Sequence, residues 1–166
     1  LMHLHVNRGK QSLTPDLKLP AAVEIYRDLV RDADVVIAAM RPGALARLGL
    51  GYVDLRAVNP RIVFCTISGY GMTGPYKDMP SHGIAFDTWA GLVNPAYDED
   101  GFCYIPEHAS MGMHAGPLFG ALGVLAGVIR ARESGQGCMR EVGQSDAVPY
   151  THLTLPTICG VEGAGG

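Results

Sequence analysis

The sequence predicts an α/β fold in which a Rossmann-like parallel sheet carries flanking helices. Two short, continuous apolar runs, "DVVIAAM" from Asp34 and "RIVFCTIS" from Arg61, are typical of parallel strands that are buried on both faces. Helical patterns precede the first run and separate it from the second. This alternation of helix and strand favours a parallel sheet over an antiparallel one.

The first helix is predicted directly after Pro20. Val23, Tyr26, Leu29 and Val30 recur at helical spacing, and proline is tolerated in the first turn of a helix. This pattern indicates an amphipathic helix that precedes the first strand.

The segment between the two strands, "RPGALARLGLGYVDLRAVNP", predicts two short helices. The glycines at positions 49 and 51 separate them, and Asn59 with Pro60 ends the second. After the second strand, residues 68–83 form a loop rich in glycine and proline. Because α/β folds place ligands at the carboxyl ends of parallel strands, we expect a binding site there.

The next segments are a short helix, "IAFDTWAGL", and an acidic loop over residues 94–110. Residues 109–129 carry no formal charge, so their length alone admits a membrane span. Pro117 and five glycines in this segment suit a buried helix better. Glycines four residues apart make faces on which another backbone can pack closely. A charged last turn, a glycine stop and a strand, "CMREVG", follow.

Composition limits the possible partners. The 166 residues are 48% hydrophobic and 17% charged, which is a globular composition of single-domain size. The net charge is −3 and the basic residues are scattered, so neither a nucleic-acid partner nor a membrane surface is expected. The four cysteines form no CxxC pair, which fits free thiols, no metal site and a cytoplasmic location.

The two ends of the chain read differently from its middle. The sequence begins inside what reads as folded sequence, so we expect an internal fragment with residues 1–147 as its structured part. Residues 148–166 lose the periodic pattern, and "YTHLTLPT" resembles translated sequencing-adapter read-through. We expect these residues to be a non-native tail, with a genuine flexible terminus as the alternative.

The chain resembles the family III CoA-transferases of the CaiB/BaiF type, which include formyl-CoA transferase, carnitine and bile-acid CoA-transferases and α-methylacyl-CoA racemase. Six stretches in the family's order carry the resemblance: "NRGKQSLTPDLK", "ADVVIAAMRPGALARLGLGY", "NPRIVFCTISGYGMTGPY", "SHGIAFDTWAG", "GALGVLAGVIRARESGQG" and "QSDAV". The resemblance implies that residues 1–147 are part of a CoA-transferase large domain that lacks its N-terminal βα unit and its second domain. It also implies an interlocked homodimer of the full-length protein, with acyl-CoA and a carboxylic acid as substrates.

The family's transferases use an aspartate at the start of the glycine-rich helix as nucleophile. Alignment on "GALGVLAGVI" places that position on Gly112, which has no nucleophile. His114, in the same first turn, is a competent proton acceptor but no substitute for a carboxylate, and it can equally be a structural histidine. Glu107, the nearest carboxylate upstream, is expected to be a solvated loop charge. The fragment itself is expected to be inactive.

His82 matches the position at which the racemase branch carries the histidine that removes the α-proton of the acyl group. A histidine at the mouth of a helix can supply such a base, although a structural helix cap is the alternative. Asp87 would point to a different helix face from His82 and is expected to be a surface or pairing charge.

For CoA, the resemblance points to Arg41, whose guanidinium can bind phosphate oxygens bidentately. It also points to the loop after the second strand as the path of the pantetheine arm, with glycines that let the backbone approach the ligand. The expected CoA-binding residues are Arg41, Gly69, Tyr70, Gly71, Gly74 and Tyr76.

Three functions follow from these expectations. The first is an acyl-CoA:carboxylate CoA-transferase, the family's common activity. The second is an acyl-CoA racemase or isomerase that uses His82 and His114 as its bases. The third is a non-catalytic CoA-binding paralogue, for which Gly112 is the main argument.

Overall fold

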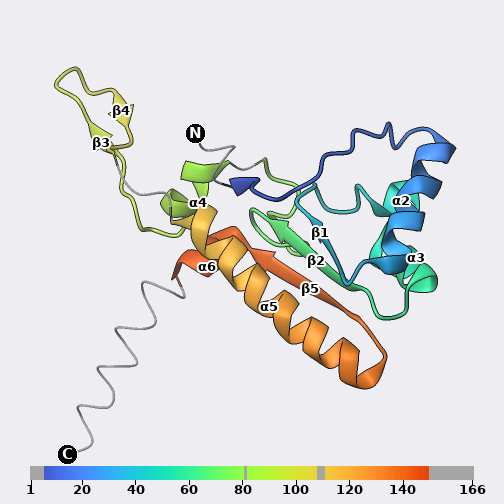
Figure 1. Cartoon of the computed structure of the whole chain (residues 1–166). Helices are drawn as coiled ribbons and strands as arrows, with labels where there is room; N and C mark the ends of the chain where they lie inside the picture. The colour runs from blue at the N-terminus through green and yellow to red at the C-terminus, as the bar shows by residue number, and fades with distance from the viewer. Residues whose placement is uncertain (1–5, 81, 108–110, 150–166) are drawn as a thin grey trace, which may run out of the picture.

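The centre of the molecule is a parallel sheet of three strands, as the sequence predicts. A computed structural model describes residues 6–80, 82–107 and 111–149. Strands β1 (Val35–Ala38), β2 (Val63–Ser68) and β5 (Cys138–Gly143) lie in the order β1-β2-β5, and Figure 1 shows them side by side. Both pairings are parallel. The sheet and its flanking helices confirm the predicted fold class.

One face of the sheet is covered by the helices that surround β1 in the chain. These are α2 (Pro20–Asp32), a short 3₁₀ helix η1 (Ala46–Leu48) and α3 (Tyr52–Val58). They match the predicted helix after Pro20 and the two short helices split at the glycines. Large aliphatic and aromatic side chains fill the space between these helices and the sheet, and the buried core consists of Val30, Val36, Ala38, Leu45, Leu50, Leu55, Ile62 and Phe64.

Asn59 joins the C-terminal end of α2 to the end of α3. Its side-chain Nδ2 donates to the carbonyl oxygens of Val30 at 3.0 Å and Ala33 at 2.9 Å, and its Oδ1 accepts from the Arg61 backbone N–H at 3.0 Å. Because the last carbonyls of a helix lack partners within the helix, this buried amide satisfies groups that would otherwise be unpaired. One polar side chain thereby fixes two helix ends beside the start of β2.

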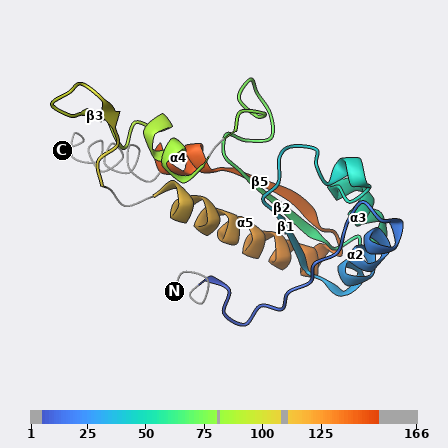
Figure 2. The same ribbon diagram turned by 90° about the horizontal axis from the view of Figure 1, so that it is seen from above.

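The opposite face of the sheet is covered by α5 (Gly112–Ser134), which packs on β2 and β5 (Figure 2). Its glycines face the sheet: a methyl group on Gly127 would lie 2.9 Å from Cγ1 of Val63, and one on Gly120 would lie 3.2 Å from Cδ1 of Ile67. The predicted close packing on a glycine face is confirmed, but strand side chains and not a second backbone lie against Gly120 and Gly127. Because Gly127 meets the start of β2 and Gly120 meets its end, α5 runs antiparallel to the strands.

The outer face of α5 is apolar and exposed. By length and composition α5 could cross a membrane, and 33% of its most apolar stretch is buried inside the molecule. The predicted buried helix is therefore buried on its sheet-facing side only. Four of its exposed apolar side chains recur every three or four residues: Leu118, Leu122, Leu125 and Ile129. Such spacing places them in one stripe along the helix.

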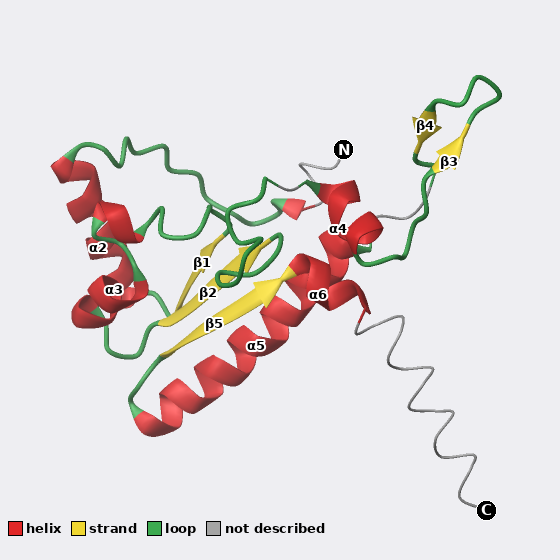
Figure 3. Cartoon of the chain, turned by 180° about the vertical axis from the view of Figure 1, so that it is seen from behind, coloured by secondary structure: helices red, strands yellow, loops and turns green. Residues whose placement is uncertain are grey.

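The connection from β2 to α5 contains a loop that begins at residue 69, helix α4 (Gly83–Trp89) and a short hairpin. The sequence analysis predicts an acidic loop for the last part, whereas the structure has β3 (Ala96–Tyr97) paired antiparallel with β4 (Cys103–Tyr104). Asp98 is the reason, because its Oδ1 accepts from the backbone N–H groups of Asp100 and Phe102 and closes a turn. Figure 3 shows this hairpin projecting away from the sheet.

The last described element, α6 (Gln144–Pro149), follows β5 without a loop. It therefore includes residues 148 and 149, beyond the domain boundary that the sequence analysis places at residue 147. The rest of the predicted tail lies outside the described residues, as does Cys159. The three described cysteines, Cys65, Cys103 and Cys138, are free thiols, as predicted.

Candidate functional site at the carboxyl edge of the sheet

The carboxyl ends of the three parallel strands meet at one edge of the sheet, which is here called the carboxyl edge. The segment after β1 carries Arg41, the segment after β2 is the glycine-rich loop, and β5 leads directly into α6. Because α5 runs antiparallel to the strands, its first turn lies at the same edge: a methyl group on Gly116 would lie 2.8 Å from Cγ of Gln144 in α6. The elements expected to bind a ligand are thus brought together.

A cavity of about 240 Å³ opens at the carboxyl edge. Its walls come from the segment after β1, the end of β2 with the glycine-rich loop, α4 and α6. Arg41 and Lys77 supply positive charge to it, and its lining residues are Ala39, Met40, Arg41, Pro42, Ile67, Ser68, Gly69, Tyr70, Lys77, Met79, Pro80, Phe86 and Gln144. Of the predicted CoA-binding residues, this cavity brings Arg41, Gly69 and Tyr70 together.

Arg41 also borders a second cavity, of about 210 Å³, between the segment after β1, the sheet and the first residues of η1 and α3. Apart from Arg41, most of its walls are apolar, with Leu45, Phe64 and Met139 among them. The two cavities share Met40 and Arg41. Arg41 therefore lies between a positively charged cavity and a mostly apolar one.

The first turn of the glycine-rich loop is held by β5 and α6. Oε1 of Glu141 accepts from the backbone N–H of Met72 at 2.5 Å, and the carbonyl of Gly69 accepts from the N–H of Ser145 at 3.0 Å. Gly71 and Gly74 have φ angles of 87° and 81°, which side chains other than glycine rarely adopt. Loop geometry therefore requires these two glycines independently of any ligand.

Aromatic rings fix the rest of this loop on α4. The Tyr70 ring makes edge-to-face contacts with Phe86 and Trp89, with ring centroids 6.2 Å and 5.4 Å away. Tyr76 contacts Trp89 in the same manner at 4.8 Å. Such pairs stabilise by about 0.5–1.5 kcal/mol beyond their burial. Tyr70 thus lines the cavity and also contacts α4, whereas Tyr76 anchors the loop on α4 without lining the cavity.

His82 is exposed and stands at the N-cap of α4, where its Nδ1 accepts from the backbone N–H of Gly83 at 3.0 Å. A neutral imidazole whose Nδ1 accepts a hydrogen bond carries its proton on Nε2. The observed contact is that of a helix cap, which is the alternative role named for His82 in the sequence analysis.

The other expected site residues lie at the start of α5. His114 is exposed in the first turn, and Gly112 is buried. Glu107 is exposed as well, which fits the expected loop charge. Residues 108–110 lie outside the described part of the chain.

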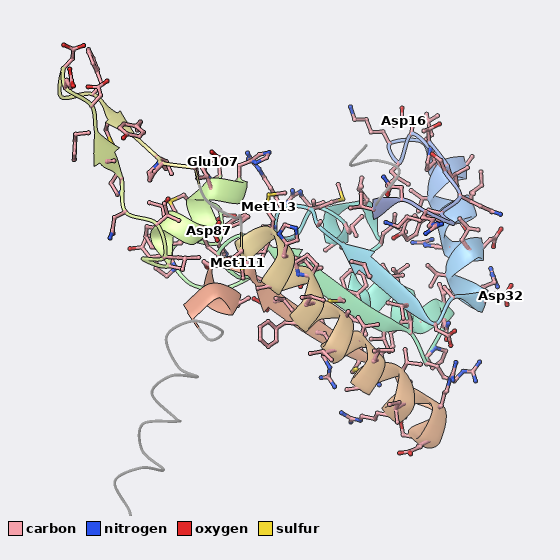
Figure 4. All side chains as sticks on the ribbon, turned by 60° about the vertical axis from the view of Figure 1, so that its left-hand side comes forward. Asp16, Asp32, Asp87, Glu107, Met111 and Met113 are labelled. Carbon is pink, nitrogen blue, oxygen red and sulfur yellow. The ribbon has the colours of Figure 1, made fainter. Side chains whose placement is uncertain are left out.

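For Asp87 the sequence predicts either a surface charge or a pairing charge, and the surface alternative is wrong. The side chain is fully buried in the contact between α4 and α5. Its Oδ1 accepts from the backbone N–H of Gly112 at 2.6 Å, and Figure 4 shows it between α4 and the start of α5, near Met111. Helical spacing assigns a side chain to a face of its own helix but does not reveal that a second helix begins against that face.

Lys77, Phe86 and Gln144 also line the first cavity and were not among the predicted site residues. Sequence signals could have indicated two of them, Lys77 and Gln144. Lys77 is the one cation in the glycine-rich loop, and Gln144 opens the "QSDAV" stretch. Within residues 6–80, 82–107 and 111–149, no three histidine, cysteine, aspartate or glutamate side chains gather as a metal site would require.

Comparison with known proteins supplies a family. The model of CoA-transferase family III matches residues 1–157. A succinate–glutarate CoA-transferase of Agrobacterium fabrum is 36% identical over 131 residues, covering 79% of this chain and 32% of that protein. The succinyl-CoA:glutarate CoA-transferase of Mus musculus is 34% identical over 134 residues, covering 81% of this chain and 30% of that protein. This chain therefore spans about a third of the length of these curated relatives.

Solved structures give the same fold. The hypothetical protein Rv3272 of Mycobacterium tuberculosis matches with a TM-score of 0.79 and 28% identity, covering 91% of this chain and 43% of that one. A CaiB/BaiF family protein from Brucella suis matches with a TM-score of 0.74 and 28% identity, covering 84% of this chain and 36% of that one.

Proposed function

The chain belongs to CoA-transferase family III, and from this premise we propose that it forms part of an acyl-CoA:carboxylate CoA-transferase. The observation that carries the proposal is the cavity at the carboxyl edge, where Arg41 and Lys77 place positive charge beside the glycine-rich loop. The similar proteins of Agrobacterium fabrum and Mus musculus are named for transfer involving succinate and glutarate. Succinyl-CoA is therefore the first donor to test.

CoA has an anionic diphosphate between an adenine nucleotide and a long, uncharged pantetheine arm. Arg41 suits the diphosphate because a guanidinium forms paired, charge-assisted hydrogen bonds to phosphate oxygens. The mostly apolar cavity on the other side of Arg41 suits the adenine ring by its lining. The pantetheine arm would then follow the loop of Gly69, Tyr70, Gly71 and Gly74, with Tyr76 anchoring that loop on α4.

The chemistry of transfer needs an enzyme carboxylate that attacks the acyl-CoA thioester and forms a mixed anhydride with release of the CoA thiolate. The thiolate then attacks the enzyme carbonyl of the anhydride, which releases the donor carboxylate and leaves CoA on the enzyme as a thioester. Gly112 supplies no carboxylate. The proposal therefore requires a nucleophile from another position, which distinguishes it from the non-catalytic CoA-binding alternative. That alternative is favoured specifically by Gly112.

The racemase alternative needs His82 or His114 as the base that removes an α-proton. Nδ1 of His82 is occupied because it accepts from the N–H of Gly83. The other ring nitrogen, Nε2, carries the proton of the neutral ring, so this contact favours the cap role over the base role. For this reason transfer is ranked ahead of racemisation.

The origin of the acyl-group pocket, the oligomeric state and the cellular location are proposals as well. We propose that the acyl-group pocket needs regions outside this chain, since the chain spans about a third of its relatives. A homodimer of the full-length protein is supported by the apolar stripe on α5, which a second subunit can cover. The three described free thiols fit a cytoplasmic location.

The test uses the full-length protein that contains this chain, incubated with succinyl-CoA. A hydroxylamine-sensitive protein adduct without exchange of α-protons into deuterated water supports transfer. Exchange without an adduct supports racemisation and rejects the proposal. Tight CoA binding with neither reaction supports the non-catalytic alternative.

A further inference from the structure

The N-terminal end of α5 receives a carboxylate from another helix. Met111, at the N-cap position of α5, makes no side-chain capping hydrogen bond. Instead Oδ1 of Asp87, from α4, accepts from the N–H of Gly112 at 2.6 Å. The exposed fraction of Asp87 is 0%, so the contact is completely shielded from water.

A buried carboxylate is costly unless hydrogen bonds and nearby positive charge compensate for the lost hydration. The start of a helix offers both, because its first N–H groups lack partners within the helix and carry the positive end of the helix dipole. A short hydrogen bond to a charged acceptor is also about twice as strong as a neutral one. Asp87 therefore ties α4 to the first turn of α5.

Both helices border the candidate site. Phe86, next to Asp87 in the chain, lines the Arg41 cavity, while the first turn of α5 carries His114 and lies at the carboxyl edge. A change in how α4 and α5 meet must move a cavity wall relative to that turn. The contact is thus placed where it controls the geometry of the site.

We propose that Asp87 is a positioning residue that holds the first turn of α5 in place at the carboxyl edge, beside the cavity proposed to bind CoA. Its complete burial separates this role from that of a nucleophile, which must reach the thioester carbon. The expected effect of Asp87 on turnover rests on the proposed function. The expected effect of Asp87 on the first turn of α5 does not.

Asp54 is a matched control. Its Oδ2 also accepts from a backbone N–H at the start of a helix, that of Gly51 at 3.0 Å, but both residues belong to the α3 end of the molecule. Removal of either carboxylate deletes a helix-start hydrogen bond. Loss of Asp87 alone should change the carboxyl edge.

The experiment compares Asp87→Asn, Asp87→Ala and Asp54→Ala in the full-length protein, by amide hydrogen exchange and by steady-state transfer from succinyl-CoA. In Asp87→Ala we expect the amides of Gly112, His114 and Ala115 to exchange at least tenfold faster. We expect kcat to fall at least tenfold, with KM for succinyl-CoA within twofold. Asp87→Asn, which keeps an acceptor oxygen, should be intermediate. Asp54→Ala should leave the exchange of these amides and kcat unchanged, and its KM is left out of the comparison because Gly51 lines the second cavity.

Unchanged exchange at these amides in both Asp87 variants would overturn the inference, even if kcat fell, because Asp87 would then act directly. A fall in kcat as large in Asp54→Ala would also overturn it, because the effect would be general destabilisation. If the unmodified protein transfers no CoA, the proposed function fails, and the exchange measurement still decides whether Asp87 holds α5. Asp87→Asn keeps the test valid if Asp87→Ala does not fold.

Discussion

The two faces of the sheet are packed by opposite means. On the face of α2 and α3, large side chains fill the space, and Leu50, Leu55 and Ile62 are fully buried. On the face of α5, glycines bring the helix backbone close to the strands, so that the side chains of Val63 and Ile67 lie directly against Gly127 and Gly120. One face is sensitive to the removal of atoms and the other to their addition.

This difference explains how the site is built. Close packing of α5 brings its first turn to the edge at which Arg41 and the glycine-rich loop also lie. The side-chain core on the other face holds β1 and the turn that carries Arg41. Each face therefore positions a different part of the candidate site, and the predictions below separate the two.

Leu55→Ala should have the largest effect on stability. Leu55 is fully buried in α3, and truncation of a buried leucine costs about 2–5 kcal/mol because it leaves a cavity. Val53→Ala, on the same helix at a position that is 80% exposed, is the control and should change little. Denaturant unfolding of the full-length protein measures both, and similar losses in the two variants would contradict the packing described for this face.

Addition of one methyl group should distinguish two glycines of α5. At Gly127 the new methyl would lie 2.9 Å from Val63, whereas at Gly123 its nearest neighbour, in the Arg140 side chain, would be 3.9 Å away. Gly123→Ala should stabilise the protein by about 0.5–1 kcal/mol through helix propensity alone. Gly127→Ala should lose that gain and destabilise by about 1 kcal/mol through overpacking. Equal Tm values would refute the close approach at Gly127.

Cys65 should make the smallest contribution to the free energy of unfolding, and this contribution should depend on pH. Burial against the α5 face raises the pKa of its thiol above the ordinary value of 9.0. Since the folded state holds this proton more tightly than the unfolded state, the stability it provides is present below pH 9 and is lost as the pH rises toward the folded pKa. One such group changes the unfolding free energy by at most about 1.4 kcal/mol per pH unit. Cys65→Ala should reduce the change of the unfolding free energy with pH, and an unaltered pH dependence would exclude Cys65 as its source.

The regular elements could be predicted because their causes are local. The apolar run of β2, the proline before α2 and the glycine after α5 each act through neighbouring residues. The position of the glycine-rich loop at the carboxyl edge could be predicted for the same reason, because Gly69 and Tyr70 directly follow β2. Arg41 was expected there only from the family resemblance, and the structure places it in the same cavity.

The remaining site features depend on contacts between distant residues. Asp87 meets Gly112 across 25 positions of the chain, and Glu141 meets Met72 across 69. No periodicity links such pairs. The turn at Asp98 is local, but its two-residue strands are too short for an alternating pattern to mark them.

We propose above all that the carboxyl edge binds CoA through Arg41. Isothermal titration of the full-length protein with CoA tests it most directly, with Arg41→Ala compared to Arg56→Ala, an exposed arginine on α3 that lines neither cavity. Loss of a charge-assisted hydrogen bond to phosphate costs about 1.5–3 kcal/mol. We therefore predict at least tenfold weaker binding in Arg41→Ala and unchanged binding in Arg56→Ala. Equal affinities in the two variants would contradict the claim.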